Sequence, residues 1–444
     1  MNPKIIVLDD DPTGSQTVHS CLLLTRWDVA TLKTALADAA PLFFILTNTR
    51  GMDAERAAEI TREVCTNLKL ALADYAGPVL FVSRSDSTLR GHYPVETDVM
   101  DAVLGPFDAT LLTPAFFEGG RITRHSTHYL MVDGKPVPTH ETEFARDSVF
   151  GYTTAFLPDY VAEKTGSRVA AENVARLTLA DLHAGGTGEW LAALHGNAVG
   201  VVDGETAGDY RLFADAVLKA AATGKRLLFR SAASLLTALA KLPQQPVAAN
   251  AFAALVRDKQ PGVVVVGSHV AKTTAQLTAL LKERGVIGLP LDVARLPDAR
   301  AAVVEELTAS IAHAHALGLT PVVFTSRAEL KFASVAERLA FGEAVSGTLM
   351  DVVKRLPETL GFLISKGGIT SNDVLSTGLA LAASRVLGQI LPGVTVVQTP
   401  PAHRLPQLPV VIFPGNVGGD GALAEAYRRL APSHAQPSPA KLAA

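Results

Sequence analysis

Short apolar runs alternate with helical patterns along most of the chain, and this alternation limits the folds that the chain can adopt. Between several of the runs, apolar residues recur at steps of three and four, as in 54–75, which is the spacing of an amphipathic helix. Strands that alternate with helices predict a mainly parallel α/β sheet. In the first half, the runs typical of buried strands are 5–8, 42–49, 77–83, 109–115, 198–203 and 225–231.

The alternation is interrupted once, near residue 250. The segment 241–262 contains three prolines, and a second series of strands and helices begins after it. Because a chain of 444 residues exceeds the usual length of one domain, this segment is the expected boundary. We predict an α/β fold of two domains with mainly parallel sheets, over 1–245 and 258–430. The proline-containing tail 431–444 is expected to be mobile.

Composition excludes several classes of function. The formal net charge of -3 gives no positive field to collect nucleic acid. No apolar run approaches the ~20 residues of a membrane helix. The two cysteines, Cys21 and Cys65, cannot form a disulfide framework, and no signal peptide precedes the first strand. We therefore expect a cytoplasmic protein without nucleic acid or membrane partners, and base rates favour a homodimer.

The loops that follow strands in the first half are rich in charge. Asp9, Asp10 and Asp11 end the run 5–8, and three adjacent carboxylates repel each other, which indicates a site for a metal, hydroxyl groups or a proton in transfer. Arg84 and Arg90 flank Asp86 after another strand, and two guanidinium groups suit bidentate capture of a carboxylate or phosphate. An ion pair that closes an exposed loop explains this second loop equally well.

The corresponding loops in the second half are rich in glycine. Segments 267–268, 367–371 and 415–419 each follow a predicted strand and precede a helical pattern, so backbone N–H groups can face an anion there. One such turn has an ordinary steric explanation, but three in one domain favour a nucleotide. The standard P-loop is absent, since Gly224-Lys225 is followed by Arg226. Lys366 is interpreted as an exposed lysine at a strand end, although it can also reach a phosphate.

Four of these motifs, in this order, resemble the four-carbon acid sugar kinase family. They are DDDPTGSQTV (9–18), SRSDSTLRGHYP (83–94), GGITSND (367–373) and PGNVGG (414–419). The resemblance implies an N-terminal domain that binds the acid sugar, a C-terminal domain that binds ATP, and an active site in the cleft between them. It implies substrate contacts by Asp10, Asp11, Arg84, Asp86 and Arg90. It implies ATP contacts by Ser268, Gly367, Gly368, Ile369, Thr370 and Gly415.

The expected reaction is phosphorylation of the terminal C4 hydroxyl of D-threonate, D-erythronate or a 3-oxo-tetronate by ATP with Mg²⁺. Such a transfer depends mostly on positioning and charge neutralisation. Asp11, Arg84 and Asp86 are the expected catalytic residues, with Asp11 preferred over Asp86 as the acceptor of the hydroxyl proton. The sequence does not identify the acid or the Mg²⁺ ligands.

Two other functions are compatible with parts of the sequence. Asp9 and Asp11, two residues apart after a strand, also match the first motif of haloacid-dehalogenase-like phosphatases, with Asp9 as nucleophile. A non-catalytic acid-sugar-binding protein would explain the arginines but not the glycine turns. A zinc site built on His125, His128 and His140 lacks regular spacing, and ordinary hydrogen bonds explain these histidines better. His92 and His269 adjoin the charged and glycine-rich loops without an assigned role.

Overall fold

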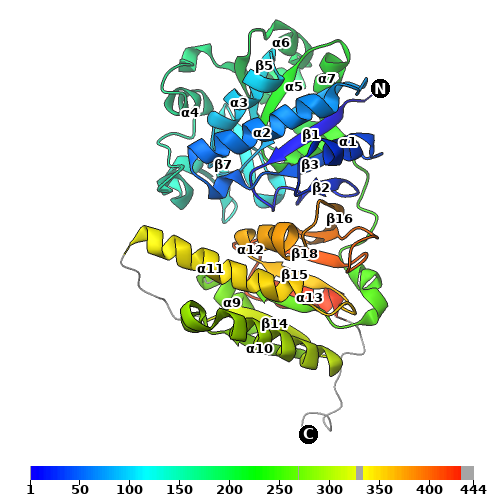
Figure 1. Ribbon diagram of the computed structural model, residues 1–444. Coiled ribbons are helices and arrows are strands. Elements are labelled where there is room, and N and C mark those ends of the chain that lie inside the picture. Colours follow the sequence, from blue (N-terminus) through cyan, green and yellow to red (C-terminus); the bar gives the residue numbers. More distant parts are fainter. Residues whose placement is uncertain (1, 269, 327–333, 432–444) are drawn as a thin grey trace. The chain divides into compact units, whose positions relative to one another are not determined.

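The computed structural model describes residues 2–268, 270–326 and 334–431, which leaves His269 and almost all of the predicted tail outside the described residues. The chain divides into two compact units, Met1–Gln244 and Gln245–Ala444, and each contains its own series of strands and helices (Figure 1). The prediction of two α/β domains with mainly parallel sheets is confirmed.

The first unit is built on a parallel sheet with the strand order β2-β3-β1-β4-β11-β5-β10-β9. All six apolar runs predicted as strands in this half form strands. The short strands β2 and β9 were not predicted, because three residues give no periodic signal. The bounds are β1 Lys4–Asp9, β2 Leu22–Leu24, β3 Leu42–Leu46, β4 Val79–Arg84, β5 Ala109–Thr113, β9 Ala175–Leu177, β10 Ala198–Val202 and β11 Leu227–Ser231.

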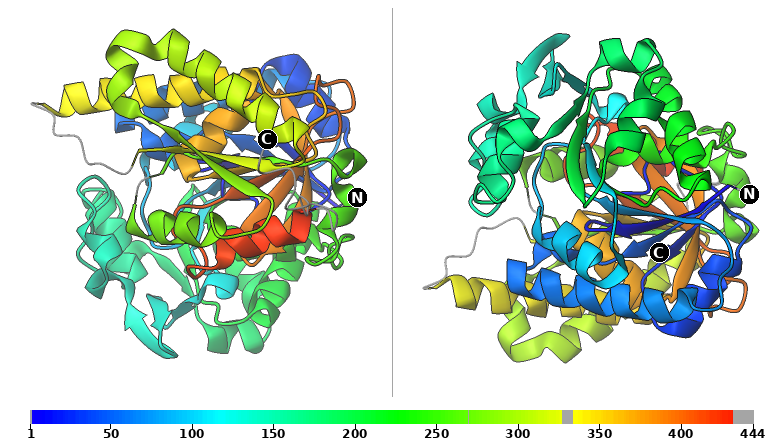
Figure 2. Two further views of the ribbon diagram at one scale, coloured as in Figure 1. Left: turned by 90° about the horizontal axis from the view of Figure 1, so that it is seen from below. Right: turned by 90° about the horizontal axis from the view of Figure 1, so that it is seen from above.

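Helices cover both faces of this sheet, which explains why its central strands are apolar without alternation. Helices α1, α2 and α3 lie together on one face and α5 to α8 on the other (Figure 2). The longest of them, α2, is capped by Asp53, whose side chain accepts a hydrogen bond from the backbone N–H of Arg56. The bounds are α1 Val29–Ala37, α2 Ala54–Leu72, α3 Val95–Leu104, α4 Leu157–Lys164, α5 Leu179–His183, α6 Thr187–Ala193, α7 Ala207–Ala222 and α8 Ala233–Ala240.

A small antiparallel sheet is inserted after β5. It consists of β6 Arg121–Arg124, β7 Thr127–Val132 and β8 Lys135–Pro138. Most of segment 116–129 is therefore a hairpin. Its turn places His125 and Ser126 at φ of 51° and 62°, and Asp203 accepts hydrogen bonds from both backbone N–H groups.

The second unit has the strand order β13-β14-β12-β15-β18-β17-β16, parallel from β13 to β18 and antiparallel thereafter. The edge strand β13 was not predicted, because Gly288 and Pro290 interrupt it; an edge position tolerates both residues. The strand bounds are β12 Val263–Val266, β13 Val286–Leu291, β14 Thr320–Thr325, β15 Leu363–Lys366, β16 Ala383–Leu391, β17 Val394–Gln398 and β18 Pro409–Phe413.

Helices of the second unit also form two layers. Helices α10 and α11 contact each other on one face of the sheet, and α9 and α13 contact each other on the opposite face (Figure 2). The core between the layers includes Phe252, Val264, Phe362, Val411 and Tyr427. The bounds are α9 Ala271–Leu280, α10 Leu296–Ala316, α11 Val335–Lys354, α12 Gly368–Asp373 and α13 Ala422–Leu430.

Candidate functional site

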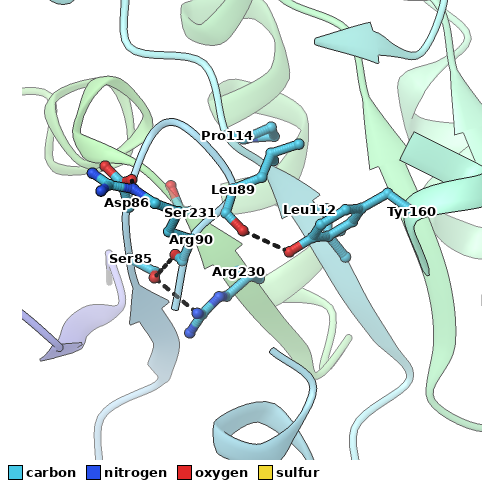
Figure 3. Close-up of a pocket in the computed structure, with 9 residues that line it drawn as sticks. All are labelled: Ser85, Asp86, Leu89, Arg90, Leu112, Pro114, Tyr160, Arg230 and Ser231. Carbon is cyan, nitrogen blue, oxygen red and sulfur yellow. Dashed lines mark hydrogen bonds and ion pairs between the residues drawn. The ribbon is translucent and has the colours of Figure 1, made fainter. Parts of the chain in front are cut away.

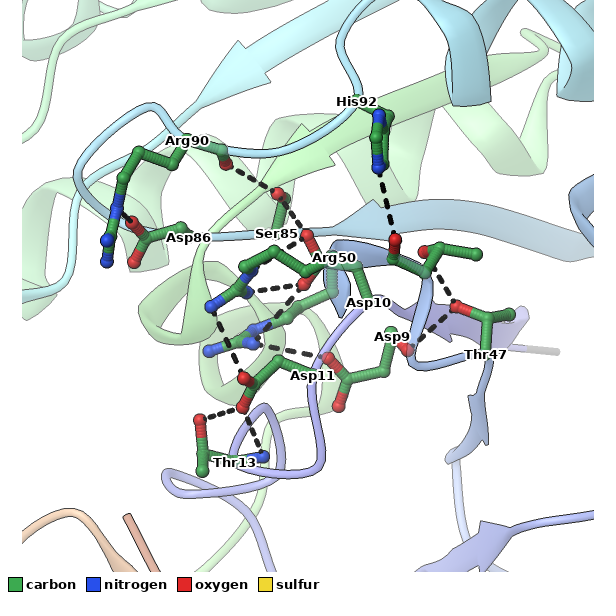
Figure 4. A network of polar contacts seen from close by, with 12 residues as sticks. Asp9, Asp10, Asp11, Thr13, Thr47, Arg50, Ser85, Asp86, Arg90 and His92 are labelled. Carbon is green, nitrogen blue, oxygen red and sulfur yellow. Dashed lines mark hydrogen bonds and ion pairs between the residues drawn. The ribbon is translucent and has the colours of Figure 1, made fainter. Parts of the chain in front are cut away.

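The charged loops of the first unit meet at the carboxyl ends of four adjacent strands. Strand β1 lies between β3 and β4, and β11 lies on the other side of β4. In register, Asp9 of β1 pairs with Arg84 of β4, and Arg84 pairs with Ser231 of β11. After β1 the chain turns towards β2 and β3, and after β4 it turns towards β5 in the opposite direction. Such a switch point is where open α/β sheets bind ligands. The resulting cluster of charges is shown in Figure 4.

Asp9 and Arg84 form the buried base of the cluster. Asp9 is 0% exposed, and its Oδ1 accepts a hydrogen bond from Arg84 Nη1 at 3.2 Å. Its Oδ2 has no hydrogen-bond partner among the described residues. Burial, together with the neighbouring carboxylates Asp10 and Asp11, raises the pKa of Asp9 to about 7 despite the opposing charge of Arg84.

Gly14 covers the Asp9 carboxylate. A Cβ at this position would lie 2.0 Å from Oδ2 and 2.2 Å from Oδ1 of Asp9, so the backbone of the loop rests directly on these oxygens. A phosphatase of the haloacid dehalogenase type needs this carboxylate free to attack a phosphorus atom. The buried and covered Asp9 does not fit that function.

Arg50 contacts the carboxylates of both Asp10 and Asp11, and it was not predicted from the sequence. It follows β3, and it donates to both oxygens of Asp10, from Nη2 at 2.5 Å and from Nε at 3.2 Å. Its Nη1 also lies 3.5 Å from Asp11 Oδ2. The available signal was its position after a predicted strand, the same criterion that selected Arg84.

A second arginine that was not predicted from the sequence, Arg230, supports Asp10 through Ser85. Asp10 is 2% exposed, and its Oδ2 accepts a hydrogen bond from Ser85 Oγ at 2.6 Å. Arg230 Nη2 donates to the same Oγ at 2.8 Å, and Arg230 Nη1 binds Glu96 at 2.6 Å. The only sequence signal for these contacts was a charged residue, Arg230, inside the apolar run 225–231.

Asp11 reaches the surface of the cluster. Its side chain is 22% exposed, and its Oδ1 accepts hydrogen bonds from the backbone N–H of Thr13, at 2.8 Å, and from the Thr13 hydroxyl. Burial alone would raise the pKa of Asp11, but Arg50, Arg84 and the Thr13 hydrogen bonds outweigh it and lower the pKa. Asp11 is therefore ionised at neutral pH.

Asp86 and Arg90 form a second, half-buried ion pair. Arg90 Nε donates to Asp86 Oδ2 at 2.7 Å, and the Thr88 hydroxyl donates to the same oxygen. Burial opposes ionisation of Asp86, but Arg50, Arg90 and these hydrogen bonds lower its pKa to about 2. Arg90 also stacks over the ring of Phe144, 5.0 Å from its centroid, which fixes the direction of the guanidinium group.

A small pocket opens beside this pair, as Figure 3 shows. Its apolar wall comes from Leu89, Leu112, Pro114 and Tyr160, whose hydroxyl donates to the Leu89 carbonyl at 2.8 Å. Its polar wall consists of Ser85, Asp86, Arg90, Arg230 and Ser231. A small polar molecule can therefore meet both carboxylate and guanidinium groups.

The histidines near the cluster support its backbone. His92 Nε2 contacts the carbonyl oxygens of Thr49 and Met52 at 3.1 and 3.0 Å. His128 lies buried between Thr123 Oγ1 and the Ser87 carbonyl, and burial lowers its pKa to about 4, so it is neutral. The described residues contain no group of three His, Cys, Asp or Glu side chains that could hold a metal ion.

In the second unit, the three glycine loops lie side by side. They follow β12, β15 and β18, which are adjacent and parallel. A Cβ on Gly267 would meet Thr370 Oγ1 at 2.3 Å, and Gly367, at φ +116°, lies against Ser268 and Thr370. Glycine at positions 267 and 367 therefore allows the loops after β12 and β15 to pack closely against each other. Ile369, in the second of these loops, is 69% exposed, which is unusual for a large apolar side chain.

Lys366 differs from the sequence interpretation. It was interpreted as an exposed lysine, but it is 0% exposed, and its Nζ donates to the carbonyl oxygens of Pro414 and Gly415 at 2.5 and 3.0 Å. The ammonium group also lies 4.5 Å from the centroid of the Phe413 ring. The error arose because the neighbouring strand β18, which covers this side chain, is distant in sequence.

Comparison with protein families matches both halves of the chain. Residues 5–239 match the sequence model of a sugar-binding N-terminal domain, and residues 263–423 match that of a nucleotide-binding C-terminal domain. The chain belongs to the four-carbon acid sugar kinase family. None of the described helices is long and apolar enough to cross a membrane.

Relatives within this family include kinases of two acids. A D-erythronate kinase of Heliobacterium modesticaldum is 30% identical over 167 residues, 36% of this chain and 36% of the relative. A D-threonate kinase of Bordetella bronchiseptica is 29% identical over 183 residues, 39% of this chain and 43% of the relative. The chain thus matches less than half the length of either relative. A Haemophilus influenzae protein of known structure has the same fold, with a TM-score of 0.66 and 16% identity over 96% of this chain and 100% of that one.

Proposed function

We propose that the protein is an ATP-dependent kinase that phosphorylates the C4 hydroxyl of a four-carbon sugar acid such as D-threonate, D-erythronate or a 3-oxo-tetronate. The observation that carries this proposal is the cluster at the carboxyl ends of β1, β3 and β4. It presents Asp11, Arg50, Asp86 and Arg90 near the surface, over a nearly buried layer of Asp9, Asp10 and Arg84. A four-carbon acid needs both kinds of group, cations for its carboxylate and anions for its hydroxyls.

In this proposal, Arg50 and Arg90 bind the carboxylate of the acid, and Asp86 orients Arg90 and a substrate hydroxyl. Asp10 and Arg84, also predicted to contact the substrate, are almost fully buried and hold Arg50 and Asp9 in place. Asp11 accepts the proton of the C4 hydroxyl, because it is ionised and its Oδ2 is not used by Thr13. Catalytic roles for Asp11, Arg84 and Asp86 stay predictions.

The nucleotide is proposed to bind at the glycine loops of the second unit, through Ser268, Gly367, Gly368, Ile369, Thr370 and Gly415. Support comes from the nucleotide-binding domain matched there and from the adjacent parallel strands β12, β15 and β18, which bring the three loops together at their carboxyl ends. ATP supplies the phosphoryl group and Mg²⁺ neutralises its phosphates. Since the described residues contain no three-ligand metal cluster, Mg²⁺ would be held largely by phosphate oxygens. Reaction between the two domains, a cytoplasmic location and a homodimer stay predictions.

The test is ADP formation from ATP and Mg²⁺ with a panel of D-threonate, D-erythronate, their L-isomers and 3-oxo-tetronates. We expect ADP release that depends on one acid and is abolished by Arg84→Ala and by Asp11→Asn. Asp74→Asn, which removes a carboxylate exposed on the surface of the same unit, is the matched control and should retain activity.

Acid binding without ADP formation would instead identify a non-catalytic acid-sugar-binding protein. Release of phosphate from a generic phosphate ester without acid-dependent ADP formation would overturn both functions and restore Asp9 as a candidate nucleophile.

A further inference from the structure

Lys366 is a buried cation that no carboxylate balances. It lies at the end of β15 with no exposed surface, and none of the ion pairs among the described residues includes it. Burial, together with the positive charge of Lys272, lowers the pKa of its ammonium group to about 7. Burial of a lysine in this way is costly, so its retention requires a compensating contact or ligand. The two carbonyl oxygens that accept from Nζ and the ring of Phe413 supply such contacts.

These two carbonyls fix the direction of the backbone in the loop after β18. The Pro414 and Gly415 carbonyls both point to the Lys366 ammonium group. Neither of the peptide bonds that follow them is cis, so each N–H points away from the carbonyl of its own peptide unit. The N–H groups of Gly415 and Asn416 therefore both face away from Lys366.

The far side of this loop is open to a ligand. A Cβ on Gly415 would meet no atom within 4 Å, and Asn416 is exposed. Neither N–H group donates to an acceptor within the described part of the chain. Two successive N–H groups on one side of a loop form a concave site for an anion.

Helix α9 holds the rest of the loop in the same manner. Gln276 Nε2 donates to the carbonyl oxygens of Val417 and Gly419 at 2.9 and 3.0 Å, and Lys272 Nζ donates to that of Gly418 at 3.2 Å. Side chains from β15 and α9 thus bind the carbonyls of Pro414, Gly415, Val417, Gly418 and Gly419. This arrangement leaves the N–H groups of the loop for a ligand of negative charge.

We propose that Lys366 is a positioning residue for the phosphate chain of the nucleotide. It does not touch the phosphates, because its ammonium group is buried. It holds the Pro414 and Gly415 carbonyls so that the N–H groups of Gly415 and Asn416 donate to phosphate oxygens. This inference rests on the proposed nucleotide site, and it assigns the residue that shapes that site.

The experiment measures direct binding of ATP and of adenosine to the full-length chain, alongside the kinetics. In Lys366→Met the affinity for ATP should fall about tenfold or more, because hydrogen bonds to a charged group are lost, while the affinity for adenosine stays unchanged. The KM for the acid should also stay unchanged. Lys282→Met, which removes an exposed lysine after α9, is the matched control for charge and should bind both ligands normally.

Lys366→Gln serves as the conservative variant and also as the substitute if Lys366→Met does not fold. Its amide N–H groups can still donate to a carbonyl, so its ATP affinity should lie between those of the wild type and Lys366→Met. Unchanged ATP affinity in both folded variants, or an equal loss for ATP and adenosine, would overturn the inference. So would a wild-type chain that binds no nucleotide. ATP binding without acid-dependent turnover would instead overturn the proposed kinase reaction and leave this inference standing.

Discussion

Replacement of Arg50 by methionine should destabilise the first unit. Methionine keeps much of the apolar stem but removes the charge that faces Asp10, whose side chain is 1% exposed. Removal of one partner from a buried ion pair costs about 3–5 kcal/mol, because the other charge remains buried and unpaired. The Arg50 side chain is 18% exposed, Ser85 still donates to Asp10, and Arg84 Nη1 stays 3.8 Å from Asp10 Oδ1, so we expect the lower limit, about 3 kcal/mol. Turnover of the acid should be lost as well.

The unfolding of this unit can be followed separately. The chain has only two tryptophans, Trp27 and Trp190, and both lie in the first unit, so their fluorescence reports on that unit. A loss of this size should lower the melting temperature by about 6–12 °C in a domain of this length. Lys33→Met is the control: Lys33 pairs with Asp74 at 2.8 Å on the surface, and its loss should cost less than about 1 kcal/mol.

A second substitution separates the loss of the pair from general damage. Asp10→Asn, added to Arg50→Met, removes the carboxylate that has lost its partner and should restore part of the stability. Two results would refute the reasoning. One is a loss below about 1 kcal/mol in Arg50→Met, as for a surface pair. The other is a double variant whose two losses simply add.

Two further predictions concern residues in contact with this cluster. The pKa of Asp9 is about 7 in the folded state, against an ordinary value of 3.8, so the folded form binds the proton more tightly. The stability that results from this tighter binding is fully present below pH ~4 and is lost as the pH rises to ~7. In Asp9→Asn, urea unfolding between pH ~5 and ~7 should therefore show a smaller fall in stability with pH than in the wild type, and an identical slope would contradict the assignment. Gly91→Ala places a Cβ 2.3 Å from Ser85 Oγ at φ +120° and should cost about 2–4 kcal/mol. Gly134→Ala, at φ +76° with no atom within 4 Å, should cost clearly less, and equal losses would show that contact with Ser85 is unimportant.

The sequence alone identified the long apolar strands and the loops at strand ends that are rich in charge or glycine. A buried strand between helices must be apolar on both faces, and this local requirement marks runs such as 5–8 and 109–115 without knowledge of their neighbours. Charged residues after one strand and glycines after another can likewise be seen in a short stretch of sequence. For this reason Asp11, Arg84, Asp86 and the glycine loops were found before the structure was known.

Only the tertiary structure decided which of these groups meet and which are buried. The order of strands in a sheet depends on contacts between distant segments, so the approach of Arg50 to Asp10 and of Arg230 to Ser85 could not be predicted from spacing. Burial likewise depends on what covers a side chain. Gly14 covers Asp9, and the segment after β18 surrounds Lys366, so two charged groups that the sequence presents as accessible lie inside the protein.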